Sequence, residues 1–246
     1  MGYARSGGQE LEMLDHLFLD TVGVLRAALE ESLLERGQDE DRLVYDLYTG
    51  ELMWETSVNL PGDGEPPKVS ANISLDWQTW SQSAWRSLTM GEDVEEMPEI
   101  GIEVIFRAQR LAARPALADL LAVLPEESIE VGGDRLARSG PVVEEAFDED
   151  SSTPEVAVEV VYEGAYRLPA PASGDASGLG PVVLPAWPGQ RVVGGDALSA
   201  RSGATRQLPS ATEATLNALG TWVASTLVRL ADLDFEYLPP PEDPEP

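Results

Sequence analysis

Apolar residues recur every three or four positions at the two ends of this chain and every second position between them. The first spacing is typical of one face of an α-helix, and the second of one face of a β-strand. Helices are therefore predicted over residues 9–36 and 211–233. Their apolar stripes are Leu11, Leu14, Phe18, Val22, Leu25, Leu29 and Leu33, and Leu216, Leu219, Val223, Leu227 and Leu230. We expect both stripes to face a core, although the first also fits a coiled-coil seam.

The segments with strand periodicity lie between these two helices. Residues 43–48 and 51–58 flank Thr49-Gly50, which predicts a β-hairpin because Gly tolerates the positive φ of a tight turn. Further strands are predicted over 69–77, 102–107 and 155–167, and a short helix over 115–124. The fold class that follows is α+β, a twisted and mostly antiparallel sheet with the two long amphipathic helices on one face.

The domain organisation predicted from composition is one α+β domain over residues 9–238. Six Pro and seven Gly fall within residues 168–210, which predicts an irregular Gly/Pro-rich insertion in this domain. Residues 1–8 and the acidic, Pro-rich residues 239–246 are expected to be disordered.

The chain has 44 acidic and 16 basic residues and a formal net charge of -28. Such a charge repels phosphate backbones and anionic lipids, so direct binding of nucleic acid or of a membrane is not expected. Two interpretations of the acidity stay open. It serves solubility or adaptation to high salt, or it provides a negative surface for a basic partner protein.

The usual catalytic residues are scarce. The chain has no Cys and a single His, and it contains neither a Gly-x-Ser-x-Gly elbow nor a phosphate-binding Gly-Lys-Ser/Thr motif. No catalytic residue and no cofactor are therefore predicted. Glu12, His16 and Asp20 are spaced by four and share a helix face, which makes them weak candidates for a metal site.

Two segments, 144–163 and 232–246, contain acidic residues and no basic ones. They supply most of the predicted interface, to which Trp187 is added because it lies in a Pro/Gly-rich loop. The interface candidates are Glu144, Glu145, Asp148, Glu149, Asp150, Trp187, Asp232, Asp234 and Glu236. Three further tryptophans, Trp77, Trp80 and Trp85, lie close together in the sequence and are expected to pack mainly into the core.

The function that these observations favour is a non-enzymatic acidic interaction module, such as an inhibitor, an immunity-type protein or an adaptor. The alternatives are a carboxylate- or metal-dependent hydrolase, a homo-oligomeric structural component and a DNA mimic. The preference for Arg, Ala, Gly and Pro resembles the coding of a GC-rich bacterial genome. A cytoplasmic location is expected, because the sequence shows neither a signal peptide nor a long apolar segment.

Overall fold

The computed structural model describes residues 7–38, 43–48, 52–61, 67–131, 134–146, 155–168 and 210–239. The predicted disordered ends and the insertion over 168–210 lie almost entirely outside these residues. The described helices are α1 (Gly7–Glu35), α2 (Thr79–Thr89), α3 (Leu117–Val123) and α4 (Ser210–Ala231). The described strands are β1 (Leu43–Tyr48), β2 (Met53–Leu60), β3 (Val69–Asp76), β4 (Glu99–Leu111), β5 (Glu127–Val131), β6 (Asp134–Arg138), β7 (Val142–Ala146) and β8 (Glu155–Arg167).

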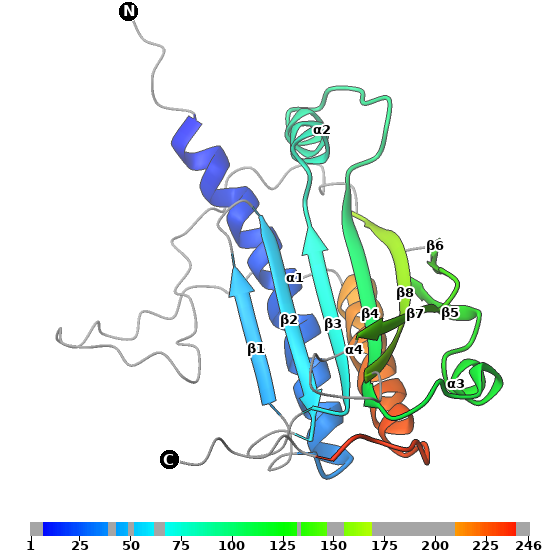
Figure 1. Ribbon diagram of the computed structural model, residues 1–246. Helices are drawn as coiled ribbons and strands as arrows, with labels where there is room; N and C mark the ends of the chain where they lie inside the picture. The colour runs from blue at the N-terminus through cyan, green and yellow to red at the C-terminus, as the bar shows by residue number, and fades with distance from the viewer. Residues whose placement is uncertain are drawn as a thin grey trace, which may run out of the picture.

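All of these strands belong to one antiparallel sheet in the order β1-β2-β3-β4-β8-β6-β5, with β7 also paired to β8 (Figure 1). The register runs without a shift from β1 to β4. It shifts between β4 and β8 after Ala108, where Arg110 has a φ of 58°. The predicted α+β class, the antiparallel sheet and the 43–58 hairpin are thereby confirmed.

Helices α1 and α4 lie behind the sheet in Figure 1, on the side to which the apolar strand residues point. From Phe18 to Leu33, every residue of the first predicted stripe is fully buried, and so is the whole second stripe. The opposing strand residues are buried as well. They include Trp54, Val58, Ile73, Leu75, Val104, Phe106, Val158 and Val160. Since apolar burial is the main driving force of folding, this layer forms the core.

The two long helices touch at Gly220. A Cβ atom at this position would lie 2.8 Å from the backbone nitrogen of Leu29 and 2.9 Å from both the Ala28 Cβ and the Leu25 oxygen. Beside this contact, the Ser32 hydroxyl donates a hydrogen bond of 3.0 Å to the Thr221 hydroxyl. Only a residue without a side chain allows α4 to approach the α1 backbone so closely.

Helix α2 was not predicted, because Trp77, Trp80 and Trp85 do not form an apolar stripe of their own. Trp77 and Trp85 are buried and meet edge to face with centroids 6.5 Å apart, whereas Trp80 is 41% exposed. The Trp77 indole donates a hydrogen bond of 2.9 Å to Ser81, whose hydroxyl donates to the Glu99 carbonyl at 2.6 Å. The expected core role is therefore confirmed for two of the three tryptophans.

Among the residues that the structure describes, no helix combines the length and the apolar character needed to span a membrane.

Glycine substitutions test the helix contact. We expect Gly220→Ala to lower the free energy of unfolding by about 1–3 kcal/mol, because the added methyl group overlaps backbone atoms of α1. The matched control is Gly23→Ala in α1, where an added Cβ meets nothing within 4 Å. That change should be neutral or stabilising by up to about 1 kcal/mol. Urea unfolding measures both, and equal effects of the two substitutions would contradict the close contact.

Candidate functional site

The sheet has a second face, opposite α1 and α4, which we name the open face. No described helix lies in front of β2, β3 and β4 in Figure 1. Its residues alternate with the buried ones along each strand, and most are partly exposed. They include Met53, Glu55, Ser57 and Asn59 on β2, Asn72, Ser74 and Asp76 on β3, Glu103, Ile105 and Arg107 on β4, and Glu159, Val161 and Glu163 on β8.

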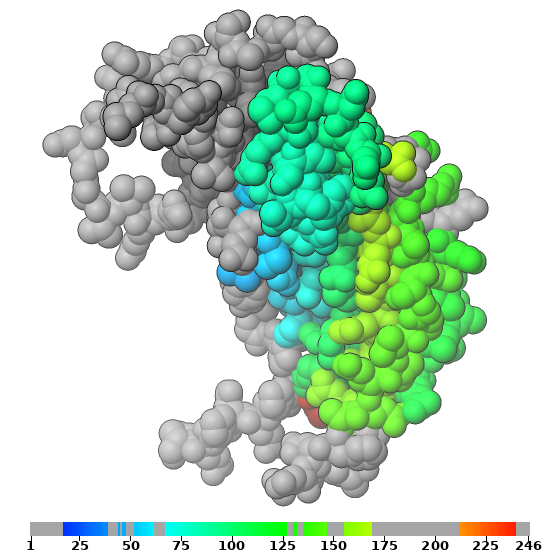
Figure 2. Space-filling view, turned by 90° about the horizontal axis from the view of Figure 1, so that it is seen from above, coloured from blue at the N-terminus to red at the C-terminus, as the bar shows by residue number. Residues whose placement is uncertain are grey.

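The space-filling view shows the molecule from above Figure 1, with the part of the chain that contains α2 toward the viewer (Figure 2). Beyond α2 the chain forms a loop that precedes β4 and contains the exposed residues Glu92, Asp93, Glu95 and Glu96. Its residues are not part of any strand of the open face. They therefore provide control positions for substitutions of acidic residues on that face.

Carboxylates outnumber cations on the open face. On β2, β3, β4, β7 and β8, strand register places eight acidic residues there: Glu55, Asp76, Glu99, Glu103, Glu144, Glu155, Glu159 and Glu163. The basic residues that the same register places there are Arg107, Arg135 and Arg167. The open face therefore carries a net negative charge.

One row across the sheet concentrates this charge. Glu55 pairs with Ser74, Ser74 with Glu103, and Glu103 with Glu163. Glu103 and Glu163 are thus directly opposite on neighbouring strands, an arrangement in which like charges destabilise a sheet. We name Glu55, Glu103 and Glu163 the acidic row. None of the three forms an ion pair with any residue that the structure describes.

The electrostatic effect of the row is visible at Glu103, which is half-buried. Burial raises the pKa of Glu103 above its ordinary value of 4.5, and the charges of Glu163 and Glu55 raise it further. A hydrogen bond between the Glu103 and Glu163 side chains acts in the same direction. Protonation of Glu103, or a cation bound beside it, therefore relieves more repulsion than it would at an isolated carboxylate.

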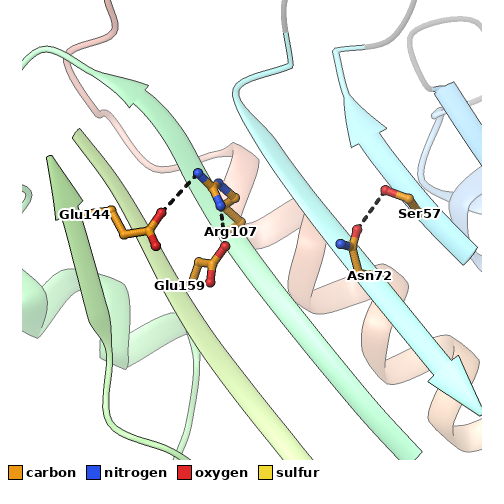
Figure 3. A network of polar contacts seen from close by, with 5 residues as sticks. All are labelled: Ser57, Asn72, Arg107, Glu144 and Glu159. Atoms are coloured by element: carbon orange, nitrogen blue, oxygen red, sulfur yellow. Dashed lines mark hydrogen bonds and ion pairs between the residues drawn. The ribbon is translucent and has the colours of Figure 1, made fainter. Parts of the chain in front are cut away.

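Arg107 shows how a cation fits on the same face. It lies four residues after Glu103 on β4, and its guanidinium forms ion pairs with Glu159 on β8 and, at 3.4 Å, with Glu144 on β7 (Figure 3). On the other side of Figure 3, the Ser57 hydroxyl donates a hydrogen bond of 2.7 Å to the Asn72 side-chain oxygen. The carboxylates near Arg107 are compensated within the chain, in contrast to the acidic row.

The predicted interface residues on β7 are engaged with arginines. Besides the contact of Glu144 with Arg107, the Arg114 side chain donates to Glu145 at 2.6 Å, and this pairing lowers the pKa of Glu145. Both carboxylates remain exposed.

The second described group of predicted residues follows α4. Asp232, Asp234 and Glu236 are exposed, and the Glu236 carbonyl accepts a hydrogen bond of 2.8 Å from the Ala112 amide. Tyr237 pairs with Leu111, Leu111 with Val156, and Val156 with Glu145. The structure therefore brings the two predicted acidic groups to the same end of the sheet, on either side of β4.

The remaining candidates lie mostly outside the described residues. This applies to Asp148, Glu149, Asp150 and Trp187 and to the side chains of Glu12 and His16. Asp20 is described and partly buried. Within the described part of the chain, no group of His, Asp and Glu side chains is arranged to hold a metal ion.

Comparisons of the chain with protein-family models, with curated proteins and with solved structures found no match.

The pH dependence of stability tests the acidic row. We expect Glu103→Gln to raise the free energy of unfolding at neutral pH by roughly 0.2–1 kcal/mol, the usual size of a cross-strand pair effect. Because the folded state raises the pKa of Glu103, the unfavourable contribution is complete above the raised pKa, is lost as the pH falls from there toward 4.5, and is absent at lower pH. The advantage of the variant should therefore disappear in acid.

Two controls accompany this measurement, which is urea unfolding over a pH series. Glu95→Gln removes one charge from the exposed loop before β4 and should change stability little. Glu159→Gln removes a partner of Arg107 and should destabilise the protein. A gain for Glu103→Gln that equals that of Glu95→Gln would show that only net charge is involved.

Proposed function

We propose that this protein is a non-enzymatic interaction module whose open face binds a basic segment of a partner protein. The observation that carries the proposal is the acidic row. Three carboxylates are aligned across the sheet, two of them directly opposite each other, without a cation from the described part of the chain.

The physical reason is that a lysine or arginine from a partner would remove the repulsion within the row. A guanidinium can contact two carboxylates at once, as Arg107 does with Glu159 and Glu144 on the same face. The benefit is realised only in the complex, because the isolated chain keeps the repulsion between Glu103 and Glu163. Charge complementarity of this kind increases association rates and sets specificity.

The arrangement of the helices supports the same proposal. We infer that α1 and α4 act as the two amphipathic helices predicted from the sequence, covering one face and leaving the other to the partner. Their buried stripes account for the inner face, and the outer face carries carboxylates and small polar residues such as Ser57, Asn72 and Ser74 beside a few apolar ones. The more specific roles of an inhibitor, an immunity-type protein or an adaptor stay predictions. The cytoplasmic location also stays a prediction.

A carboxylate-dependent hydrolase is the second candidate, because a raised pKa such as that of Glu103 is also a property of catalytic acids. Catalytic sites are usually concave and enclose their substrate. Glu163, by contrast, is exposed on the face of a sheet. Binding of a partner is therefore the function that the geometry supports better.

Binding of a cationic probe tests the proposal. The probe is a short fluorescent peptide of alternating Thr and Arg, and its affinity is measured by anisotropy at low and at high salt. We expect the combined variant Glu55→Gln, Glu103→Gln, Glu163→Gln to bind about tenfold more weakly, since each exposed ion pair contributes roughly 0.2–1 kcal/mol. Binding to the unchanged protein should weaken as salt is added.

The matched control is Asp93→Asn, Glu95→Gln, Glu96→Gln, which removes the same charge from the exposed loop before β4. We expect it to retain nearly the full affinity. Equal losses in the two variants would show that the peptide responds to net charge alone and would contradict a binding role of the open face.

A further inference from the structure

The two edges of the sheet differ in how they are protected. An exposed edge strand presents unpaired N–H and C=O groups, and proteins usually protect it with Lys, Pro, a bulge or a covering element. At one edge, β5 has an irregular register with β6, and β7 carries the ion pairs of Glu144 and Glu145 with Arg107 and Arg114. Irregular pairing of this kind is one of the usual protections.

Within the described residues, the edge formed by β1 has no Lys, no Pro and no register shift. Strand β1 lies outermost in the sheet, pairs with β2 alone, and does so over all six residues without a register shift (Figure 1). Residues 43–48 contain neither Lys nor Pro. Their one charged residue, Asp46, is held by Arg26 at 2.8 Å. The strand is therefore regularly paired with β2, and its one charge is compensated within the chain.

The side chains near this edge indicate what kind of strand would fit. Leu47 is 55% exposed, and strand register places it opposite Glu55, on the open face. Glu55 is the member of the acidic row nearest to the edge. A strand added to β1 would lie about 10 Å from β2, two strand spacings, and alternate side chains would point to the open face. Long cationic side chains at these positions could extend over Leu47 toward Glu55.

We propose that the basic segment of the partner binds in extended form as an additional strand on β1, with Lys or Arg at every second position on the open face. This inference rests on the proposed function and adds the mode of binding, in which main-chain hydrogen bonds give affinity and alternate side chains give specificity. A second copy of the chain is the other conceivable occupant. The net charge of -28 makes two copies repel, whereas it attracts a basic strand.

Amide hydrogen exchange tests the mode of binding directly. The intact protein is saturated with the alternating Thr–Arg peptide, and exchange is followed for residues 43–48, with β5 and β7 as internal controls. We expect exchange at β1 to slow on binding while exchange at β5 and β7 is unchanged. A peptide of the same composition, with its Thr and Arg residues in two blocks, should bind more weakly and protect β1 less, because its cations cannot all lie on one face of a strand.

A pair of substitutions provides a second, independent readout. Leu47→Lys places a cation on the proposed edge. Val142→Lys places one on β7, near the opposite edge of the sheet, at a residue of similar exposure, 51%. We expect the first to weaken binding of the alternating peptide about tenfold and the second less than about twofold.

The outcomes separate the two proposals. Peptide binding that depends on the acidic row but leaves exchange at β1 unchanged would overturn strand addition and retain the proposed function. If the unchanged protein does not bind the peptide at all, both the proposed function and strand addition are overturned. Protection of β1 that rises with protein concentration without peptide, together with the native mass of a dimer, would identify a second copy as the occupant and overturn the inference.

Discussion

The close packing of α1 against α4 determines which face of the sheet is left for other contacts. At Gly220 the two helices approach so closely that a methyl group would overlap the α1 backbone. Held together in this way, they form one layer behind the sheet, and Trp222 of α4 packs edge to face against Phe106 and Tyr162 with centroids 5.6 Å and 5.1 Å apart. The inner face is thereby filled, and the open face is formed by the alternate, mostly polar residues of the same strands.

The antiparallel register then decides how the charges of the open face are arranged. The same register that places Glu159 beside Arg107 also places Glu163 beside Glu103, four residues earlier on β4 and four residues later on β8. One pair is an ion pair, and the other is a repulsive pair in which the pKa of Glu103 is raised. Such a difference on one surface is more specific than a general excess of acid, which would serve solubility alone.

Much of the fold could be predicted from the sequence, because periodicity reports directly which residues face a core. The stripes from Phe18 to Leu33 and from Leu216 to Leu230 are buried, and β8 has the predicted bounds. Helix α2 escaped prediction because its buried residues, Ser81 and Trp85, form too short a pattern among polar neighbours.

The acidic row could not be predicted, because no local pattern relates Glu55, Glu103 and Glu163. Each is one of many acidic residues at alternate positions in a strand, and only the pairing of β2, β3, β4 and β8 aligns them. Sequence segments rich in acid pointed instead to Glu144 and Glu145, whose charges the structure pairs with arginines. A run of acidic residues is visible in a sequence, whereas the cations that compensate it come from elsewhere in the fold.

The central claim is that the open face is where a basic partner binds. Amide chemical-shift mapping of the isotope-labelled protein during titration with the alternating Thr–Arg peptide tests it most directly. The account predicts shifts concentrated around the acidic row on β2, β4 and β8 and on the adjoining edge strand β1. Shifts spread evenly over the acidic residues, or centred on the loop before β4 and on the exposed sides of α1 and α4, would contradict it.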